Sequence, residues 1–238
     1  MNNVLSALNF FYIENEKYIN NKGALLPSLF ANWIVWRQCL IVRIIKTAVV
    51  VFPDLEELDL AGTWEMLGAT QRLYHEGVLK DAYFELETCG KDLGPVKCYH
   101  NLKIIAEKLI EDLPRYDVVF VPGGPGRLVA QKDEKILEPI RKAYSAGKLV
   151  ASVCTGAFIL AESGILKGKR ATSFHTVIDQ LSGYGVCPVK ERVVVDGNIV
   201  TGAGISSSMD VGIKIVELML GKDAAKKITE WVEYCPPA

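Results

Sequence analysis

The sequence carries no excess of charge of either sign, and this absence excludes one class of protein. In 238 residues, 27 lysines and arginines face 28 aspartates and glutamates, which leaves a formal net charge of -1 at pH 7. Nucleic-acid-binding proteins usually carry a basic excess or a basic stripe. We therefore expect no nucleic-acid partner. Half of the chain is hydrophobic, which at this length is ample for a packed core.

The sequence also lacks the cysteine patterns of metal sites and disulfide scaffolds. Its six cysteines lie at positions 39, 89, 98, 154, 187 and 235. No pair has the CxxC spacing and no histidine lies at metal-ligand spacing from them, so we expect neither a zinc site nor a disulfide framework. Scattered free thiols are typical of a reducing compartment, which favours the cytoplasm.

The first 43 residues lack the basic start, apolar run and cleavage site of a secretory signal. Residues 24–42 are apolar, but Pro27 and Arg37 interrupt them, whereas a membrane span needs about 20 mostly apolar residues. We expect no membrane partner and assign residues 1–43 to an N-terminal extension of unknown role. Either this extension packs on the domain or on a partner, or the natural start lies near Ile44.

From residue 44 onward, strand patterns alternate with helix patterns. Apolar or alternating runs predict strands at 44–52, 82–88, 116–124, 148–154 and 171–174, and a hairpin at 192–200. Helical spacing predicts helices at 59–73, 101–113, 129–146, 155–166, 207–221 and 222–234, and a helical turn at 175–182. This alternation predicts a single α/β domain over 44–238, with a mostly parallel central sheet covered on both faces.

The segment from Ser152 to Gly156 joins an apolar strand to a helix and has the pattern of a nucleophile elbow. Such an elbow needs small residues two positions before and after the nucleophile, and Ser152 and Gly156 meet that need. The sulfur of Cys154 would lie at a helix N-terminus, which favours the thiolate. The N–H of Thr155 would face the same space and stabilise a developing anion. Cys154 is therefore the candidate nucleophile; the alternative is a buried structural cysteine.

Two other strand ends carry candidate site residues. Gly123 and Gly124 follow a neighbouring strand and can turn free N–H groups toward the sulfur as an oxyanion site, or else form a turn that needs a positive φ. Asp59 follows the first strand. Burial there would raise its pKa toward that of a usable acid or base, although Asp is also a common helix N-cap.

The sequence gives weaker support for a catalytic role of the histidines and of the remaining acidic residues near the first strand. His175 follows the elbow helix and is a possible base for Cys154, the alternative being a surface histidine. His75 and His100 have no supporting partner in the sequence. We expect the three glutamates near Asp59 to be solvated: Glu56, Glu57 and Glu65.

Four segments, taken together and in order, resemble the PfpI-like branch of the class I glutamine amidotransferase-like superfamily. They are DLAGTWEML (59–67), YDVVFVPGGPG (116–126), SVCTGAFILAESGILKGKRAT (152–172) and DGNIVTGAGISSSMDVGIKIVELMLG (196–221). Within that branch they are most similar to isonitrile hydratases and to the ligand-binding domains of AraC-type regulators. The resemblance covers residue 44 to the C-terminus and implies a flavodoxin-like three-layer α/β sandwich, often a homodimer.

The resemblance also implies roles for individual residues. It places the family nucleophile at Cys154, its acidic partner at Asp59 and a further residue implicated in isonitrile hydratases at Thr155. Gly123 and Gly124 match the backbone groups that line the pocket. Peptidase members commonly have a histidine where this chain has Thr155, which argues against a peptidase. The regulators carry a helix-turn-helix domain after this one, and the sequence ends at residue 238, which argues against DNA binding.

The favoured hypothesis is the hydration of an isonitrile to an N-substituted formamide. The thiolate of Cys154 would attack the terminal carbon, Asp59 would deliver a proton, and water would then expel the thiol. This chemistry requires no metal and no organic cofactor. Two alternatives use the same site. One is a glyoxalase III-like or deglycase enzyme acting on methylglyoxal, and the other is a non-catalytic redox-sensing or small-ligand-binding protein.

Overall fold

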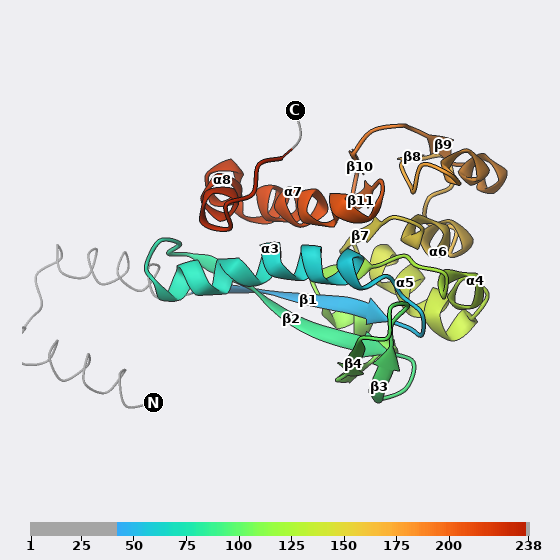
Figure 1. Ribbon diagram of the computed structural model, residues 1–238, viewed down its shortest axis with the longest axis horizontal. Helices are drawn as coiled ribbons and strands as arrows, with labels where there is room; N and C mark the ends of the chain where they lie inside the picture. The colour runs from blue at the N-terminus through green and yellow to red at the C-terminus, as the bar shows by residue number, and fades with distance from the viewer. Residues whose placement is uncertain (1–41, 237–238) are drawn as a thin grey trace, which may run out of the picture. The chain divides into compact units, whose positions relative to one another are not determined.

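The computed structural model describes residues 42–236 (Figure 1). The N-terminal extension expected over residues 1–43 falls outside this range except for its last two residues, and the boundary at residue 44 stays a prediction. Within the described range, no helix is both long enough and apolar enough to cross a membrane.

A sheet forms the middle layer of the domain (Figure 1). It has seven strands in the order β10-β11-β7-β6-β1-β2-β5. All neighbouring strands run parallel except β10 and β11, which form the predicted hairpin. The strands are β1 (Arg43–Val51), β2 (Ala82–Gly90), β5 (Lys108–Leu109), β6 (Val118–Val121), β7 (Leu149–Val153), β10 (Val193–Asp196) and β11 (Ile199–Gly202).

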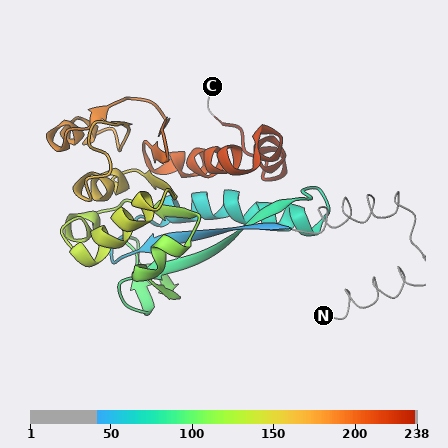
Figure 2. The same ribbon diagram turned by 180° about the vertical axis from the view of Figure 1, so that it is seen from behind.

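Helices cover both faces of this sheet, as Figure 1 and the reverse view in Figure 2 show. One face is covered by α3 (Glu57–His75), α7 (Ser208–Leu220) and α8 (Lys222–Trp231). The other is covered by α4 (Arg127–Ala130), α5 (Glu134–Ser145), α6 (Gly156–Glu162) and the 3-10 turns η2 (Ile110–Arg115) and η3 (Ile178–Tyr184). The predicted flavodoxin-like, three-layer α/β arrangement is confirmed.

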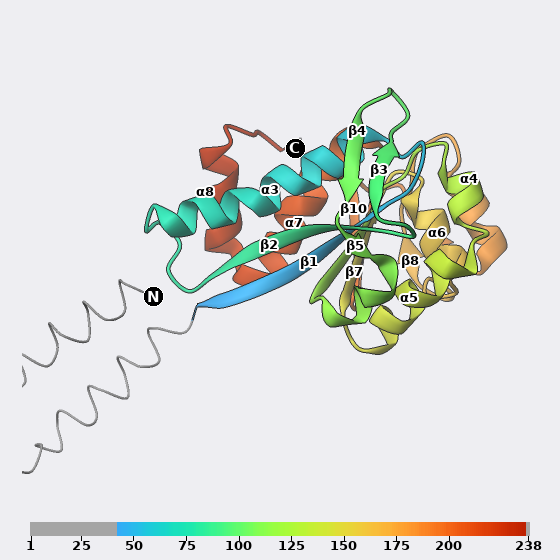
Figure 3. The same ribbon diagram turned by 90° about the horizontal axis from the view of Figure 1, so that it is seen from below.

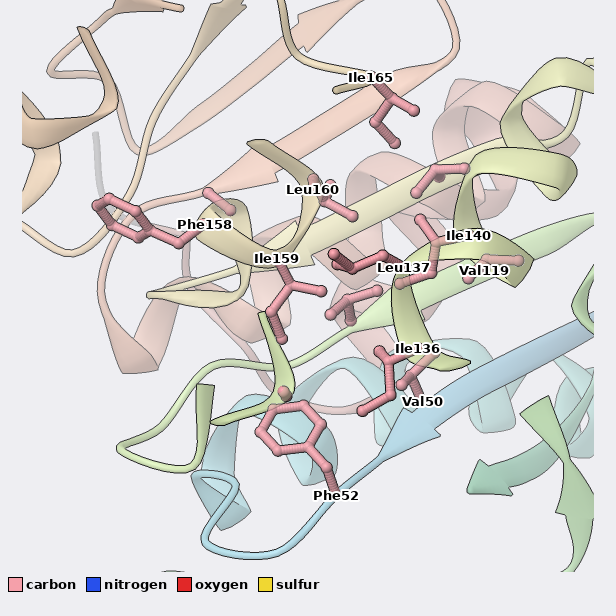
Figure 4. Packing of buried hydrophobic residues seen from close by; sticks show 14 of the residues in the cluster. Val50, Phe52, Val119, Ile136, Leu137, Ile140, Phe158, Ile159, Leu160 and Ile165 are labelled. Carbon is pink, nitrogen blue, oxygen red and sulfur yellow. The ribbon is translucent and has the colours of Figure 1, made fainter. Parts of the chain in front are cut away.

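The alternation of side chains along β1 divides the interior into two hydrophobic cores. Ala48 and Val50 belong to the core under α5 and α6, whereas Ile45 and Val49 belong to the core under α3 and α7. Figure 4 shows part of the first core, where Val50 lies among side chains of α5 and α6. Because β1 is buried on both faces, its sequence is a nearly continuous apolar run, which is why the strand could be predicted.

The helix predicted over residues 101–113 is wrong. This segment forms β4 (Lys103–Ala106), then β5, then the turn η2. β4 pairs antiparallel with β3 (Gly94–Lys97) in a separate two-stranded ribbon, which projects from the sheet in Figure 3. Pairing with a distant segment outweighs the helical spacing here, because β-branched residues such as Ile104 fit a strand better than a helix.

Three other elements differ in extent from the predictions. The helix expected over 129–146 is divided into α4 and α5, because Asp133 caps the start of α5 by accepting a hydrogen bond from the N–H of Lys135. The elbow helix α6 ends at Glu162, one turn earlier than expected. The strand expected over 171–174 is reduced to β8 (Arg170–Ala171), which pairs with β9 (Cys187–Pro188).

The sheet order places three strand ends beside one another. β1, β6 and β7 are consecutive neighbours and run parallel, so their carboxyl ends meet at one edge of the sheet. Ligand sites of open parallel sheets form at this edge. Gly123 and Cys154 directly follow β6 and β7, and Asp59 lies in the first turn of α3, which follows β1. The fold thus brings together residues separated by almost a hundred positions in sequence.

Candidate active site

Cys154 lies at the sharp turn between β7 and α6. Its φ angle is +55°, in the left-handed region that non-glycine residues adopt at a cost of about 1 kcal/mol. Its N–H donates to the carbonyl oxygen of Gly202 at 3.1 Å, which fixes the turn to the neighbouring strand β11. A Cβ on Gly156 would lie 2.4 Å from the carbonyl oxygen of Val121. The local geometry is thus the strained strand–turn–helix arrangement of a nucleophile elbow.

Asp59 lies in the first turn of α3 and is completely buried, with 0% exposure. Its Oδ2 accepts a hydrogen bond from the N–H of Gly123 at 2.8 Å, while its buried Oδ1 has no hydrogen-bond partner among the described side chains and backbone groups. Its side chain therefore points into the site and does not cap the helix.

Burial favours the neutral acid form of the Asp59 carboxyl. Burial, with a smaller contribution from the negative charge of Glu56, raises its pKa to about 8, although the hydrogen bond from Gly123 opposes the shift. Because Oδ2 already accepts from an N–H, the proton belongs on Oδ1. Asp59 is thus a carboxylic acid whose acidic proton is not used in holding the fold.

Cys154 is also protonated at neutral pH. Burial and the nearby Asp59 raise the pKa of the thiol to about 12, although hydrogen bonds from the N–H and hydroxyl of Thr155 lower it. The groups at the helix start favour the thiolate, as predicted, but burial and the carboxyl groups of Asp59 and Glu56 outweigh them.

The two glycines after β6 hold the site together in a different way from the one predicted. The N–H of Gly123 donates to Asp59, and the N–H of Gly124 donates to the Thr155 hydroxyl at 3.0 Å. Both N–H groups are therefore engaged within the protein, and the oxyanion site expected at them stays a prediction. Gly124 has a φ of +110°, and a Cβ there would lie 2.4 Å from the backbone nitrogen of Glu56.

Thr155 links the glycine turn to the elbow. Its hydroxyl oxygen accepts from the N–H of Gly124 and lies 3.3 Å from the carbonyl oxygen of the same residue. The N–H and hydroxyl of Thr155 also form hydrogen bonds with the sulfur of Cys154. Of the predicted backbone donors, the one on Thr155 is therefore the one that faces the nucleophile.

His175 is exposed, and its ring lies 4.5 Å from that of Phe174. No hydrogen bond joins it to Cys154 in the described part of the chain. The neighbouring segment is instead fixed by Ser173, whose hydroxyl donates to the carbonyl oxygen of Cys154 at 2.8 Å. The role of His175 as a base for Cys154 therefore has no hydrogen bond to support it and stays a prediction.

Glu56 is part of the site, contrary to the prediction that it is solvated. It is only 9% exposed, and its charge raises the pKa of both Asp59 and Cys154. Its N–H donates to the carbonyl oxygen of Gly123, which draws the start of α3 over the glycine turn. Glu56 lies three residues before Asp59, and this helical spacing was the available sequence signal for a second carboxylate on the same face.

His100, which we expected to have no partner, is bound by two carboxylates. Its Nδ1 lies 2.9 Å from Glu57 and 3.6 Å from Glu56, and the hydrogen bond to Glu57 raises the pKa of the imidazole. Glu57 is accordingly only partly exposed. One donor atom from each of these three residues lies within 4.8 Å of the others, so together they could hold a metal ion.

Comparison with known proteins identifies relatives over most of the described chain. The sequence profile of the DJ-1/PfpI family matches residues 45–218. An isonitrile hydratase from Pseudomonas putida is 36% identical over 187 residues, which cover 79% of this chain and 77% of that protein. A glutathione-independent glyoxalase, DJR-1.2 from Caenorhabditis elegans, is 26% identical over 189 residues, which cover 77% of this chain and 94% of that protein.

A crystal structure gives the same result for the fold. A ThiJ/PfpI family protein from Pseudomonas syringae superimposes with a TM-score of 0.73 at 31% sequence identity. The match covers 83% of this chain and 78% of that protein.

Substituting Gly123 by alanine should displace the elbow. The added Cβ would lie 2.6 Å from the backbone nitrogen of Thr155, so either the turn or α6 must shift. We expect Gly123→Ala to lower the free energy of unfolding by about 1–3 kcal/mol, as overpacking does. Gly183→Ala is the matched control, because nothing lies within 4 Å of its Cβ position. Urea unfolding measures both stabilities, and equal stability of the two variants would contradict the close packing of Gly123 against Thr155.

Replacing Asp59 by asparagine should stabilise the protein in a pH-dependent way. Below pH 4 the carboxyl is protonated in both the folded and unfolded chain. Between pH 4 and pH 8 the unfolded chain ionises while buried Asp59 does not, so stability falls as pH rises. Asparagine does not ionise. We therefore expect the stability advantage of Asp59→Asn to grow by about 1.4 kcal/mol per pH unit above pH 4, to about 5 kcal/mol at pH 8.

Thermal or urea unfolding from pH 4 to pH 8 measures this difference. An advantage that stays constant with pH would show that the carboxyl is ionised in the folded protein.

Proposed function

Because the chain belongs to the DJ-1/PfpI family, and because its elbow holds a neutral thiol beside a neutral carboxylic acid, we propose that it is an isonitrile hydratase. The reaction adds water to an isonitrile and gives an N-substituted formamide. Cys154 is the nucleophile and Asp59 the proton donor and acceptor. The observation that carries the proposal is the buried Oδ1 of Asp59, which holds a proton at neutral pH next to the thiol.

The first step forms a thioformimidate. The sulfur of Cys154 bonds to the terminal carbon of R–N≡C, and that carbon takes the proton from Oδ1 of Asp59. The thiol proton passes to Asp59, which restores its acid form. The product is Cys154–S–CH=N–R. An isonitrile carbon needs both a nucleophile and a proton, so an acid that stays protonated near pH 7 suits the substrate.

The second step releases the formamide. Water adds to the thioformimidate carbon, and Asp59 gives its proton to the substrate nitrogen while it accepts a proton from the water. The intermediate, R–NH–CH(OH)–S–Cys154, then collapses, and the proton on the hydroxyl passes through Asp59 to the departing sulfur. The products are R–NH–CHO and the free thiol. The N–H and hydroxyl of Thr155, which face the sulfur, stabilise negative charge that develops there.

A glyoxalase-like reaction is the second candidate, and the relation to the Caenorhabditis elegans glyoxalase favours it. The same thiol could add to the aldehyde of methylglyoxal as a hemithioacetal, and Asp59 could then move a proton between its carbons. The described histidines make no hydrogen bond with Cys154, so Asp59 would have to carry all proton transfers. The lower identity to the glyoxalase, 26% against 36% to the isonitrile hydratase, ranks this reaction second.

We also propose that the protein is a homodimer in the cytoplasm. Exposed apolar side chains gather on and beside the β3–β4 ribbon, where a second copy would cover them: Leu93, Tyr99, Leu102 and Ile105. The described cysteines are all free, including exposed Cys187 and Cys235, as a reducing compartment requires.

The hydratase proposal is tested by formamide formation from a simple alkyl isonitrile. We expect turnover by the wild type, a loss of at least about 100-fold in kcat/KM for Cys154→Ser and for Asp59→Asn, and little change for Cys187→Ser, which removes an exposed thiol. Activity should fall as pH rises through about 8, where Asp59 loses its proton.

Methylglyoxal consumption is measured in parallel with the same variants. Loss of methylglyoxal that depends on Cys154, without formamide formation, would replace the hydratase by the glyoxalase-like enzyme. Oxidation of Cys154 with no turnover of either substrate would favour the non-catalytic sensor.

Light scattering on the intact protein tests the dimer. We expect twice the mass of one chain for the wild type and the mass of one chain for Ile105→Glu, because a charge would enter an apolar contact. Lys103→Glu changes an exposed charge on the same strand and serves as the control. A wild type with the mass of one chain would refute the dimer.

A further inference from the structure

Arg127 is held beside the elbow by two contacts that leave part of its guanidinium unused. It is the first residue of α4, three residues after Gly124. Its Cζ lies 4.2 Å from the centroid of the Phe158 ring, and Phe158 is buried one turn beyond Cys154 on α6. Its Nη1 donates to Oε1 of Gln131 at 2.8 Å, and Gln131 is also buried. Stacking and this hydrogen bond fix the plane of the guanidinium.

The other two nitrogens of Arg127 have no acceptor in the part of the chain that the structure describes. Most described arginines pair with a carboxylate: Arg72, Arg115, Arg141, Arg170 and Arg192. Arg127 forms no such ion pair there, although it is partly buried. Its Nε and Nη2 therefore present two N–H groups on one side of the guanidinium, which is the arrangement that binds a carboxylate in a bidentate manner.

The electrostatic surroundings connect Arg127 to the reacting sulfur. Burial lowers the pKa of Arg127, whereas negative charge on Tyr184 or Cys154 would raise it, so the guanidinium lies within electrostatic range of the nucleophile. A partly desolvated cation without a counter-ion gains free energy when an anion arrives. The negative charge of Glu56, which acts on Cys154, would repel that anion, so we expect a negative group on a substrate to lie toward Arg127 and away from Glu56.

We propose that Arg127 is a specificity-determining residue that binds a carboxylate on the substrate while Cys154 attacks the reactive carbon. The substrate class is then a small anionic isonitrile, with the carboxylate a few bonds from the isonitrile carbon. The identity of the reacting group rests on the proposed hydratase function, but the anion preference of the site does not.

Alkylation of Cys154 tests the anion preference without any catalytic turnover. Iodoacetate and iodoacetamide react with the same thiolate and differ in the charge of one group. The ratio of their rates therefore cancels any change in the thiolate fraction. We expect Arg127→Gln to lower the iodoacetate-to-iodoacetamide ratio at Cys154 by about fivefold or more, the effect of one nearby charge. Peptide mass spectrometry follows the Cys154 peptide separately from the other cysteines.

Two variants make the result interpretable. Arg127→Lys keeps the positive charge and should retain most of the preference for iodoacetate, whereas Arg115→Gln removes an exposed arginine from η2 and should leave the ratio unchanged. Near-UV circular dichroism establishes that each variant is folded. A ratio that is the same for the wild type and Arg127→Gln, or that falls equally for Arg115→Gln, would overturn the proposal.

Substrate kinetics separate this proposal from the hydratase function. Isocyanoacetate and its methyl ester differ in charge, and we expect the wild type to favour the acid in kcat/KM and Arg127→Gln to lose that preference mainly through KM. If neither compound is hydrated, the hydratase function fails while the alkylation ratio still decides the anion site. If the ester is preferred by the wild type, the anion site fails while the hydratase function stands.

Discussion

The hydrogen bond from the N–H of Gly123 to Oδ2 of Asp59 is the interaction on which the site depends. It joins the loop after β6 to the first turn of α3, and it fixes which carboxyl oxygen carries the proton. A buried carboxyl with one accepted hydrogen bond and no cation beside it is more stable as the neutral acid than as the carboxylate. The acid form then places a hydrogen-bond donor, and not a negative charge, next to the thiol.

That hydrogen bond requires three backbones to approach closely, and the sequence meets this requirement with glycine. Gly124 lies against the start of α3, Gly123 against Thr155, and Gly156 against the end of β6. A side chain at any of these positions would separate the loops that carry Glu56, Asp59 and the elbow. The glycines after β6 therefore act through packing, and their N–H groups are used in holding other residues in place.

The sequence predicted the position of the site well because the relevant signals are local. Buried parallel strands are continuous apolar runs, and residues that follow them lie at one edge of the sheet. The elbow around Cys154 could be predicted from its small neighbours in sequence, Ser152 and Gly156, alone. The role of His100 could not be predicted in this way, since it depends on a loop that packs against the start of α3. For Glu56 the only local signal was its three-residue spacing from Asp59. The helix predicted over residues 101–113 was wrong for a similar reason, because β4 is fixed by pairing with β3, which precedes it in the chain and is not part of its own local pattern.

The protonation states could not be predicted either, because desolvation is a property of the whole fold. A helix start lowers a thiol pKa by a local dipole, whereas burial and two carboxyl groups raise it from several elements at once. This outcome bears on function. A redox sensor needs an accessible thiolate, since oxidants react with that form. Here the thiol is buried, and burial together with Asp59 raises its pKa to about 12. Such a site favours a reaction in which attack by sulfur and transfer of a proton occur together, as the addition of a thiol to an isonitrile carbon demands.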